Sequence, residues 1–321
     1  ATVMMLSASQ ERLSAQLLNT AVALTVMRAA AQVPPQRLMN LAPPIFVLGV
    51  LLLVAVALFG DISKGARRWL NLGFMRIQPS ELMKIAMPMM LAWYFQRREA
   101  VLSLRDYGVA ALLLLIPTAL IARQPDLGTA ILVFAAGFYV IFFAGLPWKI
   151  IIGLVAAGAA AAPLAWSLLH DYQRARIMTL LDPEKDPLGR GFHIIQSTIA
   201  IGSGGILGKG WGLGTQAQLE FIPERHTDFI FAVMSEELGL VGNMVLLFVY
   251  ALLIGRGLMI AANAPTLFSR LLAGALTLIF FTYAFVNMGM VSGILPVVGV
   301  PLPFISYGGT AMVTLGLGLG I

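Results

Sequence analysis

The sequence predicts an all-α fold, a polytopic membrane helical bundle of about ten transmembrane helices. Of the 321 residues, 59% are hydrophobic and only 11% are charged, whereas a soluble domain carries roughly 25% charged residues. Long apolar runs recur along the chain, and none alternates with the period of two that predicts a strand. These runs cover residues 13–31, 41–58, 81–95, 107–121, 129–143, 149–169, 229–254 and 271–291.

Two partial apolar segments complete the predicted set of helices. Residues 1–6 are a short apolar fragment and residues 311–321 stop within an apolar run, so we expect the first and last helices to be truncated. We expect residues 1–321 to form a single integral membrane domain, in which residues 170–228 are one long structured loop. Within that loop, residues 192–201 predict a short helix in the membrane interface.

A run of glycines follows this predicted helix, from Gly202 to Gly214. The run does not match a phosphate loop, because Gly208-Lys209 is followed by Gly210 and not by Ser or Thr. We interpret it as a flexible connector that lets the loop fold back on the bundle, with direct phosphate contact as the alternative.

The charge balance limits the classes of partner. The chain has a net charge of +6 and no cysteine, which excludes disulfides, thiolate nucleophiles and Cys-ligated metals. In a membrane chain, excess positive charge indicates contacts with membrane lipids or an anionic substrate, and no nucleic acid partner is expected.

Asp228 stands directly before the apolar run 229–254. One interpretation is a helix N-cap, in which the carboxylate accepts backbone N–H bonds. The other is a general base held at the membrane surface, where it can take a proton from a hydroxyl. The two interpretations are compatible, because a capping position fixes the geometry of a base.

Other carboxylates lie inside apolar runs, where charge is costly. Glu81 and Lys84 are three residues apart, hence on one face of a helix and within reach of each other. They indicate either a polar cavity within the bundle or a structural lock. For Glu236 and Glu237 we expect structural pairing with buried polar groups.

Cations gather in the loops on the same membrane face as Asp228. Arginine forks bind phosphate oxygens in a bidentate manner, and lipid headgroups are the alternative ligand. Trp69 is either an interface residue or a platform for a sugar ring. The candidate cations for substrate binding are Arg67, Arg68, Arg76, Arg174, Arg176, Lys209 and Arg225.

No closed metal site is expected, because His170, His193 and His226 lack ligand-like spacing. No cofactor is required by the sequence. A divalent cation, Mg²⁺ or Mn²⁺, that bridges Asp228 and a substrate phosphate is an open alternative.

Long motifs, in a fixed order along the chain, resemble the SEDS family (shape, elongation, division, sporulation). The sequence around residues 171–187 and 214–223 is similar to the elongation branch, the RodA-like proteins, rather than to the division branch. The motifs that carry the family resemblance are Gly65-Ala-Arg-Arg-Trp-Leu70, Gln78-Pro-Ser-Glu81, Gln124-Pro-Asp-Leu-Gly-Thr129, Pro223-Glu-Arg-His-Thr-Asp-Phe-Ile-Phe231, Glu236-Glu-Leu-Gly239 and Pro301-Leu-Pro-Phe-Ile-Ser-Tyr-Gly-Gly309.

The resemblance implies a peptidoglycan glycosyltransferase for cell elongation and rod shape. It would lie in the bacterial cytoplasmic membrane, with residues 170–228 and the active site on the extracellular side. Its substrate would be lipid II, whose disaccharides it would join into glycan strands with release of undecaprenyl diphosphate. The expected partner is a class B penicillin-binding protein, a transpeptidase that cross-links the product.

The resemblance also assigns roles by position. Asp228 matches the family's essential aspartate, and our hypothesis is that it deprotonates the acceptor's 4-hydroxyl, which attacks the donor's anomeric carbon with inversion. Glu81 and Lys84 match paired charges in the family's polar membrane cavity, and Trp69 matches an external tryptophan. Two alternatives from other classes are a lipid II flippase and a non-catalytic scaffold for the transpeptidase.

Overall fold

The computed structural model describes residues 7, 12–63, 66–71, 76–98, 102–168, 171–185, 190–219, 221–222 and 224–321. The chain forms two compact units. The first unit is Ala1–Gln16, Gly145–Val249 and Ala284–Tyr307; the second is Leu17–Ala144, Tyr250–Tyr283 and Gly308–Ile321. The expectation for a truncated first helix at residues 1–6 lies outside the described residues, and the single-domain organisation stays a prediction.

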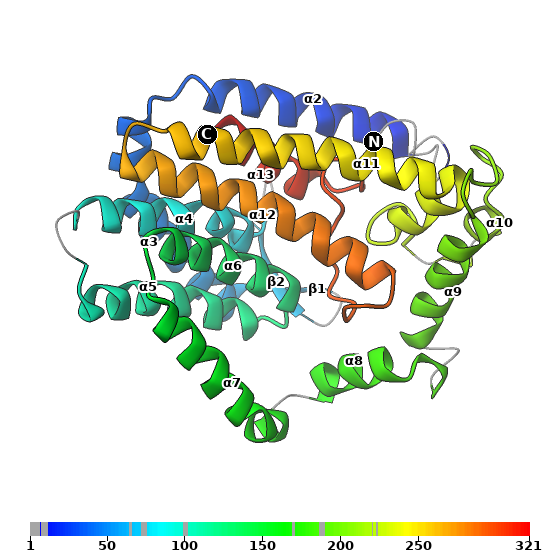
Figure 1. Cartoon of the computed structure of the whole chain (residues 1–321), viewed down its shortest axis with the longest axis horizontal. Helices are drawn as coiled ribbons and strands as arrows, with labels where there is room; N and C mark the ends of the chain where they lie inside the picture. The colour runs from blue at the N-terminus through cyan, green and yellow to red at the C-terminus, as the bar shows by residue number, and fades with distance from the viewer. Residues whose placement is uncertain are drawn as a thin grey trace. The chain divides into compact units, whose positions relative to one another are not determined.

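The second unit is a bundle in which α4 has the central place. Helix α4 contacts α3, α5, α6 and α13, and most of its residues are buried. The helices α3 to α6 lie side by side in Figure 1. This unit includes the helices α2 (Leu13–Ala30), α3 (Pro35–Phe59), α4 (Pro79–Gln96), α5 (Leu104–Ala122), α6 (Leu127–Phe143) and α13 (Gly309–Gly320).

The predicted apolar runs are confirmed as helices, and the fold is an all-α membrane bundle. Four of the described helices are long and apolar enough to cross a membrane: α3, α5, α11 (Ile230–Asn263) and α12 (Leu267–Val291). Shorter apolar helices lie at Leu127–Phe143, Trp148–Pro163 and Gly309–Gly320. Pro43, Pro44, Pro88 and Pro117 lie inside helices, as membrane helices tolerate.

The expectation of no strands is wrong for the segment between α3 and α4. Three short strands form an antiparallel sheet there in the order β1-β2-β3. They are β1 (Asp61–Ser63), β2 (Ala66–Asn71) and β3 (Arg76–Ile77). Strands this short are too brief for a period of two to show, which is why the sequence pattern did not reveal them.

The first unit holds the long predicted loop, and this loop is mostly helical. The short helix predicted at residues 192–201 is confirmed as α9, its place in the membrane interface stays a prediction, and α8 was not predicted. Helix α9 contacts α8, α10 and the 3₁₀ turn Pro183–Lys185. Helix α7 (Trp148–Leu168) precedes the loop, and the described helices within the loop are α8 (Asp171–Leu181), α9 (Arg190–Ser203) and α10 (Thr215–Gln218).

Helix α11 is broken at Gly239, whose φ is 63° and ψ is −161°. The break leaves two carbonyls and two amides without partners inside the helix, and such groups are costly at membrane depth. The glycine run satisfies all four: Lys209 N donates to Glu236 O (3.0 Å) and Gly210 N to Glu237 O (3.1 Å). In return, Leu240 N donates to Gly205 O (3.0 Å) and Val241 N to Ile206 O (3.1 Å).

The glycine run therefore does fold back, but it is held by backbone hydrogen bonds and is not a flexible connector. Its glycines are needed for two reasons. Gly208 and Gly210 adopt φ of +80° and +104°, which favours residues without a Cβ. A Cβ at Gly214 would lie 2.9 Å from Glu236 Oε2, too close to be accommodated without a shift.

Glu236 is fully buried and is paired as the sequence suggests. Its Oε1 accepts hydrogen bonds from Lys209 Nζ (2.7 Å), Thr215 Oγ1 (3.1 Å) and Gln216 N (3.0 Å). Glu237 accepts a hydrogen bond from Ser7 Oγ. A buried carboxylate with a cation and several donors is the arrangement that offsets its desolvation, so Glu236 fastens the glycine run to α11.

Gly208→Ala is expected to destabilise the protein by about 1–3 kcal/mol, since a side chain at positive φ is strained and its Cβ would overlap Glu237 O. Gly202→Ala is the matched control, because Gly202 lies in α9 with nothing within 4 Å of an added Cβ. Thermal unfolding in detergent checks both. An unchanged unfolding temperature for Gly208→Ala would contradict the fixed docking of the run.

Candidate functional site

Asp228 lies in the first unit, in the turn that leads into α11. Two backbone hydrogen bonds close this turn, from Thr227 N (3.0 Å) and Phe229 N (3.4 Å) to Glu224 O. Phe229 and Ile230 are buried, so they anchor the turn, while Asp228 is half-buried. The backbone around Asp228 is thus held in place, while the residue itself is partly exposed.

The segment after α12 faces this turn. Gly299 has φ of +72°, and a Cβ at this position would lie 3.4 Å from Asp228 Oδ2. Further along, Ser306 Oγ donates to Thr227 O (2.6 Å), and Tyr307 N donates to His226 O (2.8 Å). The carboxylate of Asp228 therefore lies close to the backbone of Gly299, which carries no side chain.

Two histidines flank Asp228. The ring of His193, on α9, stacks on Phe229 with centroids 5.7 Å apart, and burial lowers the pKa of His193. Nε2 of His226 lies 2.7 Å from Arg12 Nη1, so the neutral ring accepts a hydrogen bond from the guanidinium. Burial, followed by the charge of Arg12, lowers the pKa of His226 below its ordinary value of 6.5.

The depressed pKa of His226 predicts a loss of stability in acid. His226 takes up a proton near pH 6.5 in the unfolded chain and only at lower pH in the folded chain. The stability that the neutral ring contributes to the folded protein is therefore complete above pH 6.5, and it is lost as pH falls through the pKa of the folded state. The charged neighbours are Arg12 and Arg225, which lower the pKa of His226, and Glu224, which raises it.

His226→Gln is expected to reduce the fall in unfolding temperature between about pH 7 and pH 5, because glutamine accepts the hydrogen bond from Arg12 without titrating. Tryptophan fluorescence during heating, in matched buffers, measures the difference. Identical pH dependence in the parent and the variant would show that His226 does not titrate differently in the two states.

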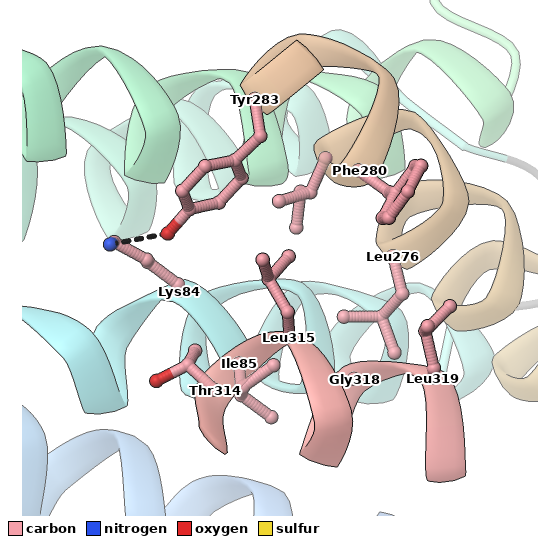
Figure 2. Close-up of a pocket in the computed structure, with 10 residues that line it drawn as sticks. Lys84, Ile85, Leu276, Phe280, Tyr283, Thr314, Leu315, Gly318 and Leu319 are labelled. Carbon is pink, nitrogen blue, oxygen red and sulfur yellow. Dashed lines mark hydrogen bonds between the residues drawn. The ribbon is translucent and has the colours of Figure 1, made fainter. Parts of the chain in front are cut away.

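The second unit contains a separate polar cluster around Lys84, shown in Figure 2. Lys84 Nζ donates to Glu81 Oε1 (2.6 Å) on the same helix and to Tyr283 OH (2.5 Å) on α12. The ammonium also lies 5.0 Å from the Tyr283 ring centroid. Thr314 Oγ1, on α13, donates to Glu81 Oε2 (3.2 Å), so one ion pair joins three helices.

The predicted contact between Glu81 and Lys84 is confirmed, and a cavity adjoins it. The cavity has a volume of about 20 Å³, room for a water molecule. Figure 2 shows Lys84, Tyr283 and Thr314 toward one end, while leucine, isoleucine and phenylalanine side chains line most of the remainder. Lys84 itself is 3% exposed. Whether this cluster serves substrate binding stays a prediction.

Several of the predicted phosphate-binding cations have partners within the protein. Arg68 donates to Gln124 O (3.4 Å) and to Pro125 O. Arg174 donates to Trp166 O (3.0 Å) and Ser167 O (2.6 Å). These arginines cap backbone turns, and Lys209 pairs with Glu236, so part of their donor capacity is used in folding.

For the remaining candidate residues, the structure gives the element in which each lies and how far each is exposed. Trp69 in β2 is half-buried, Arg76 in β3 is exposed, and Arg225 is half-buried in the turn that contains Asp228. The side chains of Arg67 and Arg176, like His170, lie outside the described residues. The described structure places Arg225 alone among these cations within the Asp228 turn itself.

Sequence reasoning missed Tyr283, Thr314 and Asn287, which are polar residues within apolar helices. A polar side chain inside a membrane run is itself a signal, because burying it without a partner is costly. This reasoning applies directly to Asn287, because its side chain is completely buried and its neighbours in the run 271–291 are apolar.

The family model for the FtsW, RodA and SpoVE proteins, described as "Cell cycle protein", matches residues 2–321. The chain belongs to this SEDS family. The relatives include the peptidoglycan glycosyltransferase MrdB of Escherichia coli K12, which is 59% identical over 302 residues, 94% of this chain and 82% of MrdB. A probable peptidoglycan glycosyltransferase FtsW of Geobacter metallireducens is 40% identical over 276 residues, 85% of this chain and 72% of FtsW.

Two solved structures resemble the fold. A chain of a peptidoglycan synthase complex, described as coordinating polymerization and crosslinking, has a TM-score of 0.85 and 36% identity, covering 99% of this chain and 91% of its own. The rod shape determining protein RodA of Thermus thermophilus has a TM-score of 0.73 and 30% identity, covering 99% and 89%. The likeness extends over nearly the whole of both chains, which supports the helical membrane bundle.

Proposed function

We infer that this SEDS protein is a peptidoglycan glycosyltransferase that polymerises glycan strands. The observation that carries this conclusion is the 59% identity over 302 residues with the E. coli glycosyltransferase MrdB. The higher identity to MrdB than to the FtsW proteins favours a role in cell elongation and rod shape. The substrate is lipid II, a disaccharide-peptide on undecaprenyl diphosphate.

Asp228 acts as the general base in the proposed mechanism. Its carboxylate takes the proton of the acceptor's 4-hydroxyl as that oxygen bonds to the donor's anomeric carbon, with inversion. The bond from the anomeric carbon to the diphosphate breaks, and its electron pair leaves with undecaprenyl diphosphate. The placement of Asp228 at the surface of a fixed turn supports this role, because a base must hold its geometry to be effective.

The leaving diphosphate needs stabilisation of charge more than it needs a proton. Arg225 lies three residues before Asp228, and it is our first candidate for this contact. Arg68, Arg174 and Lys209 are weaker candidates, because their hydrogen bonds hold them at segments other than the Asp228 turn. Arg67, Arg76 and Arg176 stay predictions for binding the substrate.

A divalent cation, Mg²⁺ or Mn²⁺, would fit this site only if it were held by Asp228 together with a phosphate of the substrate. Among the described residues, no group of three or more His, Cys, Asp or Glu side chains could hold a metal. Proteins commonly bind Mg²⁺ through one carboxylate together with substrate phosphates. At this site Asp228 would supply the carboxylate. The ion would neutralise phosphate charge, while proton transfer remains with Asp228.

The protein is a multi-pass membrane protein, and we place it in the bacterial cytoplasmic membrane with the active site on the periplasmic or extracellular side. That side is where lipid-linked disaccharides become accessible to polymerisation. A class B penicillin-binding protein is the proposed partner, and the structural similarity to a chain of a peptidoglycan synthase complex supports such an assembly.

The decisive experiment supplies lipid II to the purified protein, alone and with a class B penicillin-binding protein, with and without Mg²⁺. Glycan polymer separated on a gel is the readout, and a transpeptidase inhibitor keeps the product uncrosslinked. Polymer that depends on this chain supports the glycosyltransferase. A folded complex that makes no polymer would contradict the proposal and favour transport of lipid II or a scaffold role.

A further inference from the structure

Asn287 connects the Asp228 turn to the segment that faces it. This residue is on α12 within the first unit and has no exposed surface. Its single amide nitrogen, Nδ2, donates to Asp228 O (2.9 Å) and to Val300 O (2.7 Å). An amide nitrogen has two hydrogens, so both are used to hold carbonyls from two different parts of the chain.

The orientation of this amide follows from its surroundings. Turning it over would place Oδ1 against two carbonyl oxygens, which repel it, so Nδ2 must face them. In this orientation Oδ1 is buried without a hydrogen-bond partner in the described part of the chain. A buried polar atom left unsatisfied is unfavourable, and in a native structure it calls for a functional or structural reason.

The two carbonyls belong to the two sides of the candidate site. Asp228 O is the backbone of the proposed base itself. Val300 O follows Gly299, the residue that faces Asp228 Oδ2. One side chain therefore sets the distance between the base and the backbone that lines its reactive edge.

A second side chain supports the same arrangement from the adjacent residue. Ser306 Oγ donates to Thr227 O (2.6 Å) and accepts from Leu302 N (2.7 Å). Ser306 thus fixes the carbonyl of Thr227, the residue before the proposed base. Asn287 differs in bonding the residue of the proposed base directly.

We propose that Asn287 is a positioning residue for Asp228, which holds the base and the Gly299 segment at a fixed separation so that an acceptor hydroxyl can enter between them. This inference rests on the proposed function, since it assigns Asn287 to the same reaction. Asn287 transfers no proton and touches no substrate. Its effect is on the rate of the chemical step, for which a displacement of 1 Å can cost about 10²-fold.

The first test uses Asn287→Leu, which keeps the size of the side chain and removes both donors. We expect the turnover of lipid II into polymer to fall by about 10–100-fold, while KM for lipid II changes by less than about twofold because binding groups are untouched. Ser197→Ala is the matched control. Ser197 is also fully buried and donates to Val291 O (2.9 Å) at the end of α12, so it bonds the helix that carries Asn287 without bonding either of the carbonyls that Asn287 holds.

The second test uses Asn287→Asp and a pH profile, which separates positioning from packing. A protonated carboxyl can donate one hydrogen bond and an ionised carboxylate cannot. The activity of Asn287→Asp, divided by that of the parent at the same pH, should therefore rise as pH is lowered from about 8 to 6 and the carboxylate takes up a proton. This ratio also serves as the deciding measurement if Asn287→Leu does not fold.

The outcomes separate this inference from the proposed function. Active parent and control, with turnover lost in Asn287→Leu and a rising ratio in Asn287→Asp, support the positioning role. An active parent with near-parental turnover in Asn287→Leu would overturn it and leave the function intact. A flat ratio in Asn287→Asp would likewise overturn it. Absence of polymer from the parent would overturn both.

Discussion

Asp228→Asn is expected to reduce the rate of glycan polymerisation by about 10²–10⁴-fold, the contribution that a general base typically makes. Asparagine has nearly the same size and can still accept hydrogen bonds at a helix start, but it cannot take the proton from the acceptor hydroxyl. The neighbouring contacts, including the approach of Gly299, are preserved. The loss should therefore appear in turnover, with little change in the unfolding temperature.

Glu224→Gln provides the matched control for this variant. Glu224 is a carboxylate in the same turn, it is exposed, and its carbonyl accepts the hydrogen bonds that close the turn. Replacing its side chain removes one negative charge close to Asp228 and leaves those backbone bonds in place. We expect near-parental polymer from Glu224→Gln in an assay of initial rates with lipid II.

The comparison distinguishes a base from a general effect of negative charge. Equal losses in Asp228→Asn and Glu224→Gln would indicate that the turn needs charge and has no specific base. Parental polymer from both would return Asp228 to the role of a helix cap. Only a loss confined to Asp228→Asn assigns proton transfer to this carboxylate.

The helical part of the fold could be predicted because the membrane imposes it. A long apolar run has to satisfy its backbone groups internally, so it forms a helix whatever its partners. The predicted run 129–143 and the observed α6 (Leu127–Phe143) end at the same residue. The starts differ by two residues, because Asp126 caps the helix by accepting from Thr129 N (3.3 Å).

The glycine run shows what the sequence could not provide. Composition indicates a chain with few restrictions on φ, and a flexible connector follows from that alone. The break at Gly239 in α11 supplies the partners that fix the run, and a glycine within an apolar helix does not by itself predict a break. The interaction depends on two segments about thirty residues apart.

Two of the four residues in the polar cluster of the second unit could be predicted from the sequence. The spacing of Glu81 and Lys84 places them on one helix face, and their contact follows. Tyr283 and Thr314 are far away in the chain and come from α12 and α13, so only the fold brings them together. The roles of all four depend on whether the cluster is needed for catalysis or for stability.

Lys84→Met, which keeps the length and apolar stem of the side chain, is expected to impair polymerisation by at least about tenfold, equivalent to 1.4 kcal/mol. It also leaves the half-buried Glu81 without its cation, and breaking a fully buried pair typically costs about 3–5 kcal/mol of stability, so we expect a cost toward or below the lower end of that range. The unfolding temperature of the single variant should fall for this reason, although the protein still inserts into membranes. Activity measured on Lys84→Met alone therefore mixes two effects.

The double variant Glu81→Gln with Lys84→Met separates the two effects. Replacing both members of a buried ion pair is often neutral for stability, and glutamine can still accept the hydrogen bond from Thr314 Oγ1. We expect the unfolding temperature to recover toward that of the parent while polymer output stays low. This result would mean that the reaction needs the charges themselves. Recovery of both quantities together would show that the pair is a structural lock joining α4, α12 and α13, because activity would then follow stability alone.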